Sequence, residues 1–510
     1  MSESTKRKIA GNIEALAGMV RDLRTEGKRV VMCHGVFDLV HIGHIRHFEE
    51  ARKQGNALIV TLTPDRYVNK GVHRPVFPQE LRAEAVAALD VVDYVGVNEW
   101  PTAVETLRQV RPDVYCKGGE YKTAQVDAKS NLEPELVTAE EVGAEVCFTD
   151  DLVFSSSRLL NEHFTQFTPE TEAWLEAFRA EHSEEGILEY LEVARRKKVL
   201  VVGEAIVDEY VYCSALGKST KDPVLAFQQR DSEAFPGGSL AVANHIAGFC
   251  DDVTLVTTLG DHDRKEEFVR DSLVQNVDPV FLTKSDSPTI TKTRFLDRYT
   301  QTKLLEIYSM NDATLAAPND QALLDALGKV DDYDIVIVAD YGHGMLGPSA
   351  IEKICSTSGF LAVNTQSNAG NRGFNTISRY KRADYVCLAT HEIAIETRLR
   401  EAPTEDLLIE VSNRIDCDRF TVTRGREGSL HHTRGEQFVR VPAFASQVVD
   451  RVGAGDAFLA VSTILLEQSA PWEVVGLVGN VAGARVVSEL GNRHSLDRVS
   501  TSKHVISLLK

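Results

Sequence analysis

The sequence predicts an α/β protein built from two doubly wound domains, each with a mainly parallel sheet and helices between its strands. Three observations predict this fold class. At 510 residues the chain is longer than one ordinary hydrophobic core supports. Patterns typical of strands and helices alternate along it, and the alternation starts afresh after residue 195. The hydrophobic content of 43% is sufficient for two sizeable cores.

The amino-acid composition limits the classes of molecule that the protein is expected to bind. The formal net charge of −19 argues against a general nucleic-acid binder, because binding a phosphate backbone needs clustered Lys and Arg. Small anionic substrates remain possible, since local basic clusters can hold them. Eight cysteines without a CxxC pair, no signal-peptide pattern and no apolar run of membrane-spanning length together predict a cytoplasmic protein that binds small molecules and neither nucleic acid nor membrane.

The first domain is expected over residues 27–165, after an N-terminal helical segment, 1–26. The hydrophobic spacing predicts helices over 13–28, 45–55, 77–90 and 102–111, and strands over 29–38, 57–65, 92–97, 113–118 and 145–150. This order is typical of a parallel sheet, in which ligands bind at the carboxyl ends of the strands. Residues 35–44 lie at such an end.

Residues 166–195 are charged, amphipathic and poor in Pro and Gly, so we expect a helical connector that packs against a domain. The second domain is expected over residues 196–510. Its strands are predicted from 197 onward, and then over 253–260, 334–342, 360–366, 383–389 and 419–425, with helices between them.

The stretch "HGVFDLVHIGHIRHF", residues 34–48, carries four histidines in fifteen positions. A metalloprotease would need HExxH on a helix and a third ligand, so His41 and His44, three apart at a strand-to-helix turn, do not indicate a metal site. They could simply cap and pack. Their neighbours favour a phosphate site, because Gly35 and Gly43 permit close backbone approach and a helix expected to start near Ile45 offers free N–H groups.

"GVFDLVHIGH" resembles the signature of the HxGH nucleotidyltransferases, and "NKGVHRPVFPQELR", "CKGGEY" and "FSSSRLL" resemble further segments of that family in the same order. The resemblance implies a Rossmann-like domain in which His41 and His44 hold the nucleotide phosphates. Arg74 is assigned to the substrate, although Arg74 and Arg82 could equally be surface charges. The other residues implied in nucleotide binding are Gly35, Phe37, Asp38, Gly43, Lys117, Ser155, Ser156, Ser157 and Arg158.

The chemistry of such a site is simple. A substrate phosphate attacks the α-phosphorus of a nucleoside triphosphate in line, and pyrophosphate leaves. Catalysis then consists of orienting the reactants and stabilising charge, with Mg²⁺ expected and no protein nucleophile required.

A second candidate site is predicted from "VVDRVGAGDAFLA", residues 448–460, where a Gly-rich turn precedes an apolar helix. Alone it could be a structural turn or an anion hole. In context it resembles the (D/N)TGAGD signature of ribokinase-like (PfkB) sugar kinases, and no Walker-type GKS/T is present. The resemblance implies that Asp456 is the general base and that Gly453, Ala454 and Gly455 bind the transferring phosphoryl group.

Other segments resemble the same kinases in order. "VVGEAIVDEY" and "FPGGSLAVANHIA" imply sugar binding by Asp208, Gly237 and Gly238. "PTITKTRFL" and "ADYGHGML" match segments of heptose-phosphate kinases, and "VTRGREG" resembles the nucleotide-contacting turn. Asn480, further along the C-terminal helices, is implied in nucleotide binding.

Three positions depart from the kinase pattern. Ala241 stands where a GGAAN-type motif has Asn, the DPK-like segment reads "VNTQSN" from Val363 and includes Asn364, and the NxxE segment reads "ATHE", with Ala389 in place of Asn and Glu392 kept. Loss of a polar contact weakens binding of a hydroxylated ligand. Either the sugar or metal handling differs from the family norm, or the kinase half has become a binding module. The intact "GAGD" favours retained catalysis.

The two halves together resemble the bifunctional heptose-phosphate kinase/nucleotidyltransferases, in which the kinase domain comes first and not, as here, second. We therefore expect a bifunctional sugar kinase and nucleotidyltransferase that uses ATP, Mg²⁺ and CTP or ATP as nucleotidyl donor, and a homodimer. One alternative is a cytidylyltransferase for a polyol or alcohol phosphate with a non-catalytic, sugar-sensing kinase-like domain. The other is an interaction protein without activity.

Overall fold

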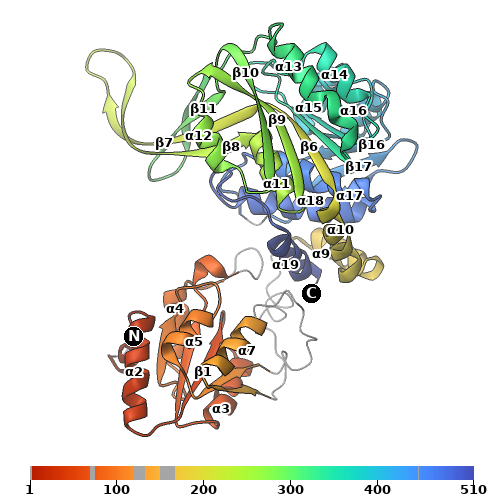
Figure 1. Cartoon of the computed structure of the whole chain (residues 1–510). Helices are drawn as coiled ribbons and strands as arrows, with labels where there is room; N and C mark the ends of the chain where they lie inside the picture. The colour runs from red at the N-terminus through yellow and green to blue at the C-terminus, as the bar shows by residue number, and fades with distance from the viewer. Residues whose placement is uncertain (1–2, 69–74, 119–131, 150–166, 446, 510) are drawn as a thin grey trace. The chain divides into compact units, whose positions relative to one another are not determined.

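The computed structural model describes residues 3–68, 75–118, 132–149, 167–445 and 447–509. The chain divides into two compact units, residues 1–166 with 510, and residues 167–509 (Figure 1). Five residues assigned to the transferase site lie outside the described residues, namely Arg74, Ser155, Ser156, Ser157 and Arg158.

The first unit contains a five-stranded parallel sheet in the order β3-β2-β1-β4-β5. Its strands are β1 Val30–Gly35, β2 Ala57–Leu62, β3 Tyr94–Val97, β4 Val114–Lys117 and β5 Glu145–Phe148. The sequence predicted all five. Because chain order reverses between β1 and β4, the carboxyl ends of these two strands are the usual ligand position in such a sheet.

Helices cover both faces of this sheet. They are α1 Glu3–Lys8, α2 Ile13–Thr25, α3 Ile42–Arg52, α4 Gln79–Ala87, α5 Val104–Val110 and α7 Leu132–Glu141, with a 3₁₀ turn at Asp65–Tyr67. Ile13, Leu16 and Val20 of α2 pack with α5 on one face, and Phe48 of α3 packs with α4 on the other. Burial on both faces explains why β1 begins with an apolar run, Val30–Cys33.

The connector consists of two helices, α9 Pro169–Glu181 and α10 Glu184–Val193, followed by a 3₁₀ turn at Ala194–Arg196. Both helices belong to the second unit, since Leu175, Phe178, Ile187 and Leu191 join its core. Arg179 also donates a hydrogen bond of 2.7 Å to the carbonyl of Leu508. The apolar stripe of this charged segment is therefore buried against the second unit.

The second unit is built on a nine-stranded sheet in the order β10-β9-β6-β13-β14-β15-β16-β17-β18, parallel except for the last two strands. The strands are β6 Lys198–Gly203, β9 Asp252–His262, β10 Val277–Pro288, β13 Ile335–Asp340, β14 Phe360–Thr365, β15 Tyr385–Ala389, β16 Arg419–Thr423, β17 Ser429–Thr433 and β18 Val439–Val441. The strands that the sequence predicted here are all present.

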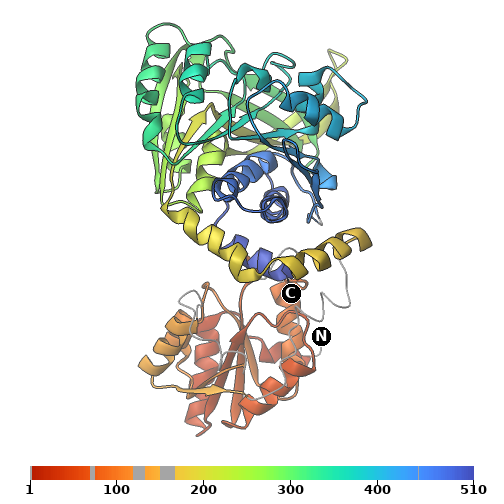
Figure 2. The same cartoon turned by 90° about the vertical axis from the view of Figure 1, so that its right-hand side faces the viewer.

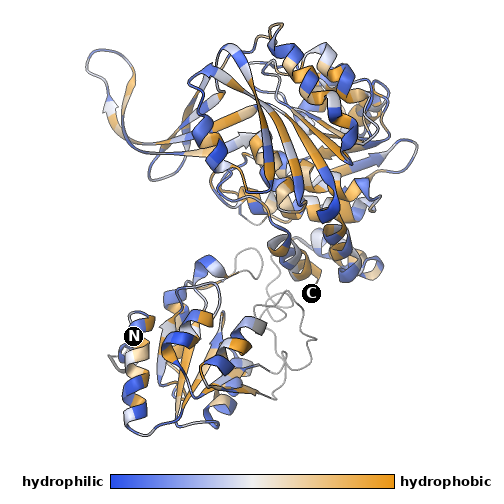
Figure 3. Ribbon diagram, in the orientation of Figure 1, coloured by the Kyte–Doolittle hydropathy of each residue, from blue (hydrophilic) through white to orange (hydrophobic). Residues whose placement is uncertain are grey.

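Two hydrophobic clusters pack helices on the two faces of this sheet, and Figure 2 shows helices on both sides. The helices on one face are α11 Ser239–Ala247, α17 Ala454–Glu467, α18 Trp472–Val487 and α19 Arg498–Leu509. The helices on the other face are α13 Asn319–Ala326, α14 Pro348–Cys355, α15 Thr390–Thr397 and α16 Thr404–Ser412. A further helix, α12 Glu266–Ser272, follows β9. The central strands are hydrophobic along their length in Figure 3, as strands buried on both faces require.

A second sheet of four strands, which the sequence patterns did not predict, belongs to the same unit. It has the order β12-β11-β7-β8, from β7 Ala205–Lys218, β8 Leu225–Gly238, β11 Thr291–Asp297 and β12 Lys303–Ser309. β7 and β8 form a long hairpin that extends away from the rest of the unit (Figure 1). Because only Glu204 separates β6 from β7, the two strands look like one apolar run in the sequence.

Candidate active sites

His41 and His44 form the start of α3. His41 Nδ1 accepts a hydrogen bond from the Gly43 amide at 3.1 Å, and His44 Nδ1 accepts one from the His41 amide at 3.4 Å. The rings stack with their centroids 4.0 Å apart. The helix therefore begins at Ile42, earlier than the expected start near Ile45, because the His41 side chain caps its first amides.

These hydrogen bonds indicate which nitrogen of each imidazole carries the proton. A ring that accepts at Nδ1 carries its proton on Nε2, and an Nε2–H group is a donor suited to a phosphate oxygen. Burial lowers the pKa of His41 and so favours this neutral form. Capping and phosphate binding are therefore compatible roles, each using a different ring nitrogen.

Phe37 packs beside the His41 and His44 pair. Its backbone is left-handed, with φ of 50°, and its ring lies where a Cβ on Gly35 would come within 3.0 Å of it. The same ring meets His44 edge-on, with centroids 5.4 Å apart. Gly35 thus makes room for Phe37, and Phe37 orients His44.

Asp38 and Arg82 anchor the segment that leads into α4. The Asp38 carboxylate accepts the amides of Val76 and Phe77 at 2.9–3.2 Å. The side chain of Arg82, in a residue only 1% exposed, donates to the carbonyls of Phe77, Val36 and Thr63 and to Asp65. The interpretation of Arg82 as a surface charge is therefore wrong, and Asp38 contacts backbone amides of the protein itself.

Lys117 lies at the carboxyl end of β4, beside β1. Its Nζ is 2.7 Å from Glu135 Oε2, and both side chains are buried. Glu135 also accepts the Tyr115 hydroxyl at 2.8 Å and the Ala103 amide at 2.9 Å. Burial alone would raise the pKa of Glu135, but the charge of Lys117 holds it below its usual value. Glu135 thus fixes the Lys117 ammonium group at the carboxyl end of β4.

Two further histidines of the same stretch take part in the site, although the sequence gave them no role. His34 Nδ1 lies 2.9 Å from Thr61 Oγ1, and His47 Nδ1 lies 2.9 Å from Thr149 Oγ1. Burial, followed by the charge of Lys117, lowers the pKa of each to about 4. These neutral rings tie β1 and α3 to the neighbouring strand ends, and the spacing of four histidines was the signal.

In the second unit, Asp456 lies in the first turn of α17. Gly453 caps this helix with φ of +84°, and a Cβ there would lie 1.9 Å from Asn492 Oδ1. At Gly455, in contrast, a Cβ would meet no atom within 4 Å. Open space therefore lies over the first turn, where backbone amides have no partner within the helix and attract an anion.

The Asp456 carboxylate is buried and receives a hydrogen bond of 2.8 Å from the Tyr341 hydroxyl to Oδ1. Burial raises the pKa of Asp456 to about 7; the hydrogen bond and the charge of Lys292 oppose the rise, and the charge of Asp208 adds to it. A carboxylate with this pKa can accept a proton near neutral pH.

The four-stranded sheet brings Asp208, Gly237 and Gly238 together. Asp208, 3% exposed, forms an ion pair with Arg294, and a Cβ on Gly237 would lie 2.1 Å from Asp208 Oδ2. Gly238 has φ of +59° and leads into α11. The charge of Asp208 contributes to the raised pKa of Asp456, which indicates that the two carboxylates lie near each other.

Lys292 on β11 is a residue of this site that the sequence did not single out. It is 6% exposed, and its Nζ lies over the Tyr308 ring, 5.4 Å from the centroid. Burial lowers the pKa of Lys292, while the charge of Asp208 opposes the change. The signal was present in "PTITKTRFL", where alternate residues of a strand place Lys292 and Arg294 on one face.

The structure also shows the surroundings of three further residues that the sequence singled out, Ala241, Asn364 and Asn480. Ala241 is buried in α11, and Asn364 donates to the Cys387 carbonyl at 2.8 Å. The Asn480 amide on α18 donates to Ser429 Oγ and to the carbonyls of Val441 and Pro442 at 2.9–3.2 Å.

Glu392 accepts the amides of Ala389 and Ser367 at 2.7 and 3.2 Å, and burial raises the pKa of Glu392 to about 7. Among the described residues, no group of three or more His, Cys, Asp or Glu side chains could hold a metal ion.

A parallel sheet with a second, smaller sheet beside it, a Gly-rich helix start and a buried Asp define a nucleotide-dependent carbohydrate kinase fold. Residues 196–498 match the family described as pfkB family carbohydrate kinase. This match covers more than half of the chain, and the chain belongs to that family. Residues 32–160 match the family described as cytidylyltransferase-like. Both predicted domain types, and the α/β fold class, are confirmed.

Curated relatives carry the name "Bifunctional protein HldE". The chain is 28% identical to the one from Rhodopseudomonas palustris (strain TIE-1) over 309 residues, which is 59% of this chain and 62% of the relative. It is 39% identical to the one from Geotalea uraniireducens over 134 residues, 25% of this chain and 27% of the relative. The chain therefore spans less than two thirds of the length of these relatives.

Among solved structures, phosphofructokinase-2 from Escherichia coli in complex with potassium is similar, with a TM-score of 0.51, 16% identity and coverage of 62% of this chain and 100% of that chain. This likeness shows the fold of the second unit. No helix within the described residues is long and apolar enough to cross a membrane.

Proposed function

We propose that this protein is a bifunctional enzyme. Its second unit phosphorylates a heptose-like sugar or sugar phosphate from ATP, and its first unit couples the phosphorylated product to a nucleotide with release of pyrophosphate. The observation that carries the proposal is the buried Asp456, with a pKa raised by burial to about 7, at a helix start whose first turn faces open space. The name of the relatives, "Bifunctional protein HldE", agrees with two activities in one chain.

In the kinase half, Asp456 takes the proton from the acceptor hydroxyl as that oxygen attacks the γ-phosphorus of ATP. The amides of residues 453–455 face the charge that develops on the transferring phosphoryl group. Asp208, fixed by Arg294, accepts hydrogen bonds from sugar hydroxyls. Mg²⁺, when bound, would neutralise phosphate charge. The ion typically needs only one or two protein carboxylates beside the phosphates, and the buried Glu392, whose charge interacts with that of Asp456, could supply one.

In the transferase half, the Nε2–H groups of His41 and His44 donate to the phosphates of CTP or ATP, and the N-terminus of α3 adds its positive end. Lys117, fixed by Glu135, supplies a further positive charge at the carboxyl end of β4. A sugar phosphate then displaces pyrophosphate without a protein nucleophile. The kinase half thus makes the phosphate group that the transferase half consumes.

The test is ADP formation from ATP and Mg²⁺ with a panel of heptose, hexose and pentose phosphates and free sugars. Wild type is compared with Asp456→Asn and with Asp331→Asn, an exposed Asp whose carboxylate accepts hydrogen bonds from the amide and hydroxyl of Ser358. We expect ADP with one class of acceptor from the wild type and Asp331→Asn, and none from Asp456→Asn. ADP formation by Asp456→Asn at the wild-type rate would refute the assignment of the base.

One observation favours a second function. The side chains of Ala241 and Ala389 cannot make the polar contacts that Asn makes in the family pattern, as a domain that senses a sugar without phosphorylating it would permit. In that case a sugar changes the rate of pyrophosphate release by a cytidylyltransferase for a polyol or alcohol phosphate, and no ADP forms. Measuring pyrophosphate and ADP in the same reaction separates the two functions.

A homodimer in the cytoplasm is part of the proposal. Apolar side chains of β12, namely Leu304, Leu305 and Ile307, are exposed on the single chain, as a surface covered by a second copy would be. Sedimentation equilibrium should give twice the chain mass of 56.3 kDa, and the chain mass itself would refute the dimer.

A further inference from the structure

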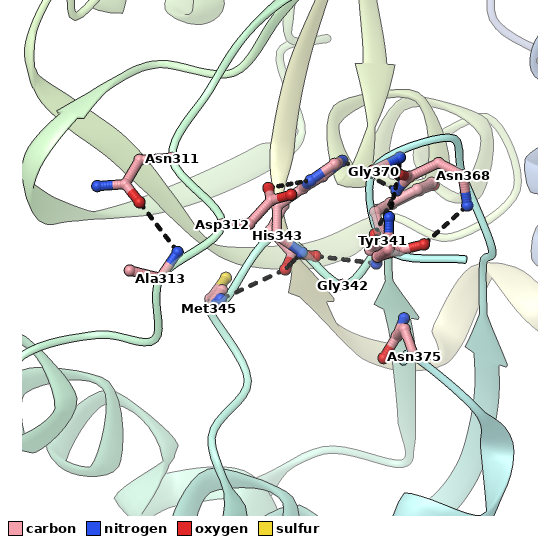
Figure 4. A network of polar contacts seen from close by, with 12 residues as sticks. Asn311, Asp312, Ala313, Tyr341, Gly342, His343, Met345, Asn368, Gly370 and Asn375 are labelled. Atoms are coloured by element: carbon pink, nitrogen blue, oxygen red, sulfur yellow. Dashed lines mark hydrogen bonds and ion pairs between the residues drawn. The ribbon is translucent and has the colours of Figure 1, made fainter. Parts of the chain in front are cut away.

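The loop that follows β13 is held in one conformation by polar contacts from several directions. Glu204, buried at the β6–β7 junction, accepts the amides of Tyr341 and His343 at 3.0 Å each. Asn368 and Asn371 donate to the Tyr341 carbonyl at 2.9 and 2.6 Å. Figure 4 shows Asn368 beside the short segment that contains Tyr341, Gly342 and His343.

Glycine is required beside this tyrosine. Gly342 has φ of +70°, and a Cβ there would lie 2.2 Å from Asn371 Nδ2. The backbone of Tyr341 is therefore fixed through its own amide and carbonyl and through the residue that follows. Its ring is buried, and its hydroxyl reaches Asp456 Oδ1, 115 residues further along the chain, at 2.8 Å.

The other oxygen of Asp456 has a different environment. Among the described residues, no amide or side chain donates a hydrogen bond of regular geometry to Asp456 Oδ2. A hydrogen bond to Oδ1 restricts rotation of the carboxylate group. Oδ2 is then the oxygen that is in position to receive a proton. Of the side chains in this loop, Tyr341 is the one whose hydrogen bond to Asp456 the structure shows, and the contacts described above fix the backbone on both sides of it.

We propose, resting on the proposed kinase function, that Tyr341 is a positioning residue: its hydroxyl holds Asp456 Oδ1 so that Oδ2 faces the acceptor hydroxyl. Glu204, Asn368 and Asn371 act on the reaction only through Tyr341. Removing the hydroxyl also removes a hydrogen bond that stabilises the ionised carboxylate, so the base must become harder to deprotonate.

The first experiment compares the pH dependence of kcat/KM for ADP formation in the wild type, Tyr341→Phe and Tyr380→Phe. Tyr380 is an equally buried control, whose hydroxyl donates to Asp340 Oδ2 at 2.8 Å. For Tyr341→Phe we expect the acid limb to move up by about one pH unit, which is roughly tenfold at pH 6. Tyr380→Phe should keep the wild-type profile.

A graded variant replaces the tyrosine at position 341 with 3,5-difluorotyrosine, which keeps the shape and donates a stronger hydrogen bond. Its acid limb should move to lower pH, and this variant serves if Tyr341→Phe does not fold. An unchanged limb in the Tyr341 variants, or the same shift in Tyr380→Phe, would overturn the proposal, because a loop-wide packing effect would then explain the result.

A measurement without turnover separates this proposal from the kinase assignment. In a double-mutant cycle of unfolding at pH 8, Tyr341→Phe and Asp456→Ala should be strongly non-additive, because each removes the same contact. Additive effects would refute the positioning contact. Non-additive effects in a chain that forms no ADP with any acceptor would instead refute the kinase function and keep the contact.

Discussion

Gly453 and Gly455 are two residues apart, yet the structure predicts opposite consequences for replacing them with alanine. Gly453 has φ of +84°, where a residue with a Cβ is strained by about 1 kcal/mol. The new Cβ would also lie 1.9 Å from Asn492 Oδ1, so Asn492 must move and lose its 3.0 Å hydrogen bond to the Pro236 carbonyl, a further loss of about 1 kcal/mol. Gly453→Ala should therefore destabilise the second unit by about 2 kcal/mol.

Gly455→Ala differs in each respect. The position is helical without a positive φ, and a Cβ there meets no atom within 4 Å. Stability should be unchanged or higher by up to about 1 kcal/mol, because Ala is the better helix former. The methyl group instead projects into the space over the first turn, where the transferring phosphate is expected, so ADP formation should fall at least tenfold.

Urea unfolding of the full chain measures the first effect. Of the three tryptophans, Trp100 lies in the first unit and Trp174 and Trp472 in the second, so a Trp100→Phe background reports the second unit by fluorescence. ADP formation measures the second effect. Equal stability losses in both variants, or a Gly455→Ala enzyme that is fully active, would refute the assignment of strain to one glycine and of phosphate space to the other.

Three further outcomes are expected. His44→Ala should abolish pyrophosphate release while circular dichroism and the melting temperature of the first unit stay near the wild type; near-normal turnover in a folded variant would contradict the transferase site. Arg82→Met should destabilise the first unit by about 3 kcal/mol or more in urea unfolding, because three backbone carbonyls and Asp65 lose a buried donor; a loss below about 1 kcal/mol would show that water replaces the guanidinium. Because burial raises the pKa of Asp456 to about 7 and only the ionised form is a base, kinase activity should fall as pH drops below about 7, and a kcat/KM profile flat from pH 5 to 8 would exclude Asp456 as the base.

The parts of this structure that the sequence predicted are those set by local patterns. Parallel strands buried on both faces give apolar runs, and helices between them give a 3.6-residue period, so the succession of these strands and helices along the chain could be predicted. The His41 and His44 pair is also local, since its hydrogen bonds join residues two and three apart. The start of α3 was misplaced because a histidine is an unusual cap.

The four-stranded sheet shows where local patterns fail. β7 and β8 alternate buried and exposed residues only in part, and β12 is exposed along most of its length. A strand that packs only one face at the edge of a unit has a weak hydrophobic signal. Two residues of this sheet that belong to the site, Lys292 and Arg294, were consequently not singled out, although the segment that contains them resembled the kinase family.

The contacts that give the kinase site its chemistry join residues far apart in the chain. The Tyr341 hydroxyl reaches Asp456 across 115 positions, and Arg294 reaches Asp208 across 86. No pattern in one sequence encodes such pairs, because each partner satisfies its own local rules independently of the other. A motif such as "GAGD" locates the base, but whether that base works near neutral pH depends on burial and on a hydroxyl from another strand. The substitutions at Ala241 and Ala389 leave both the Asp456 carboxylate and its tyrosine partner in place, and this is why the structure favours a kinase that has changed its sugar contacts over a domain that has lost its reaction.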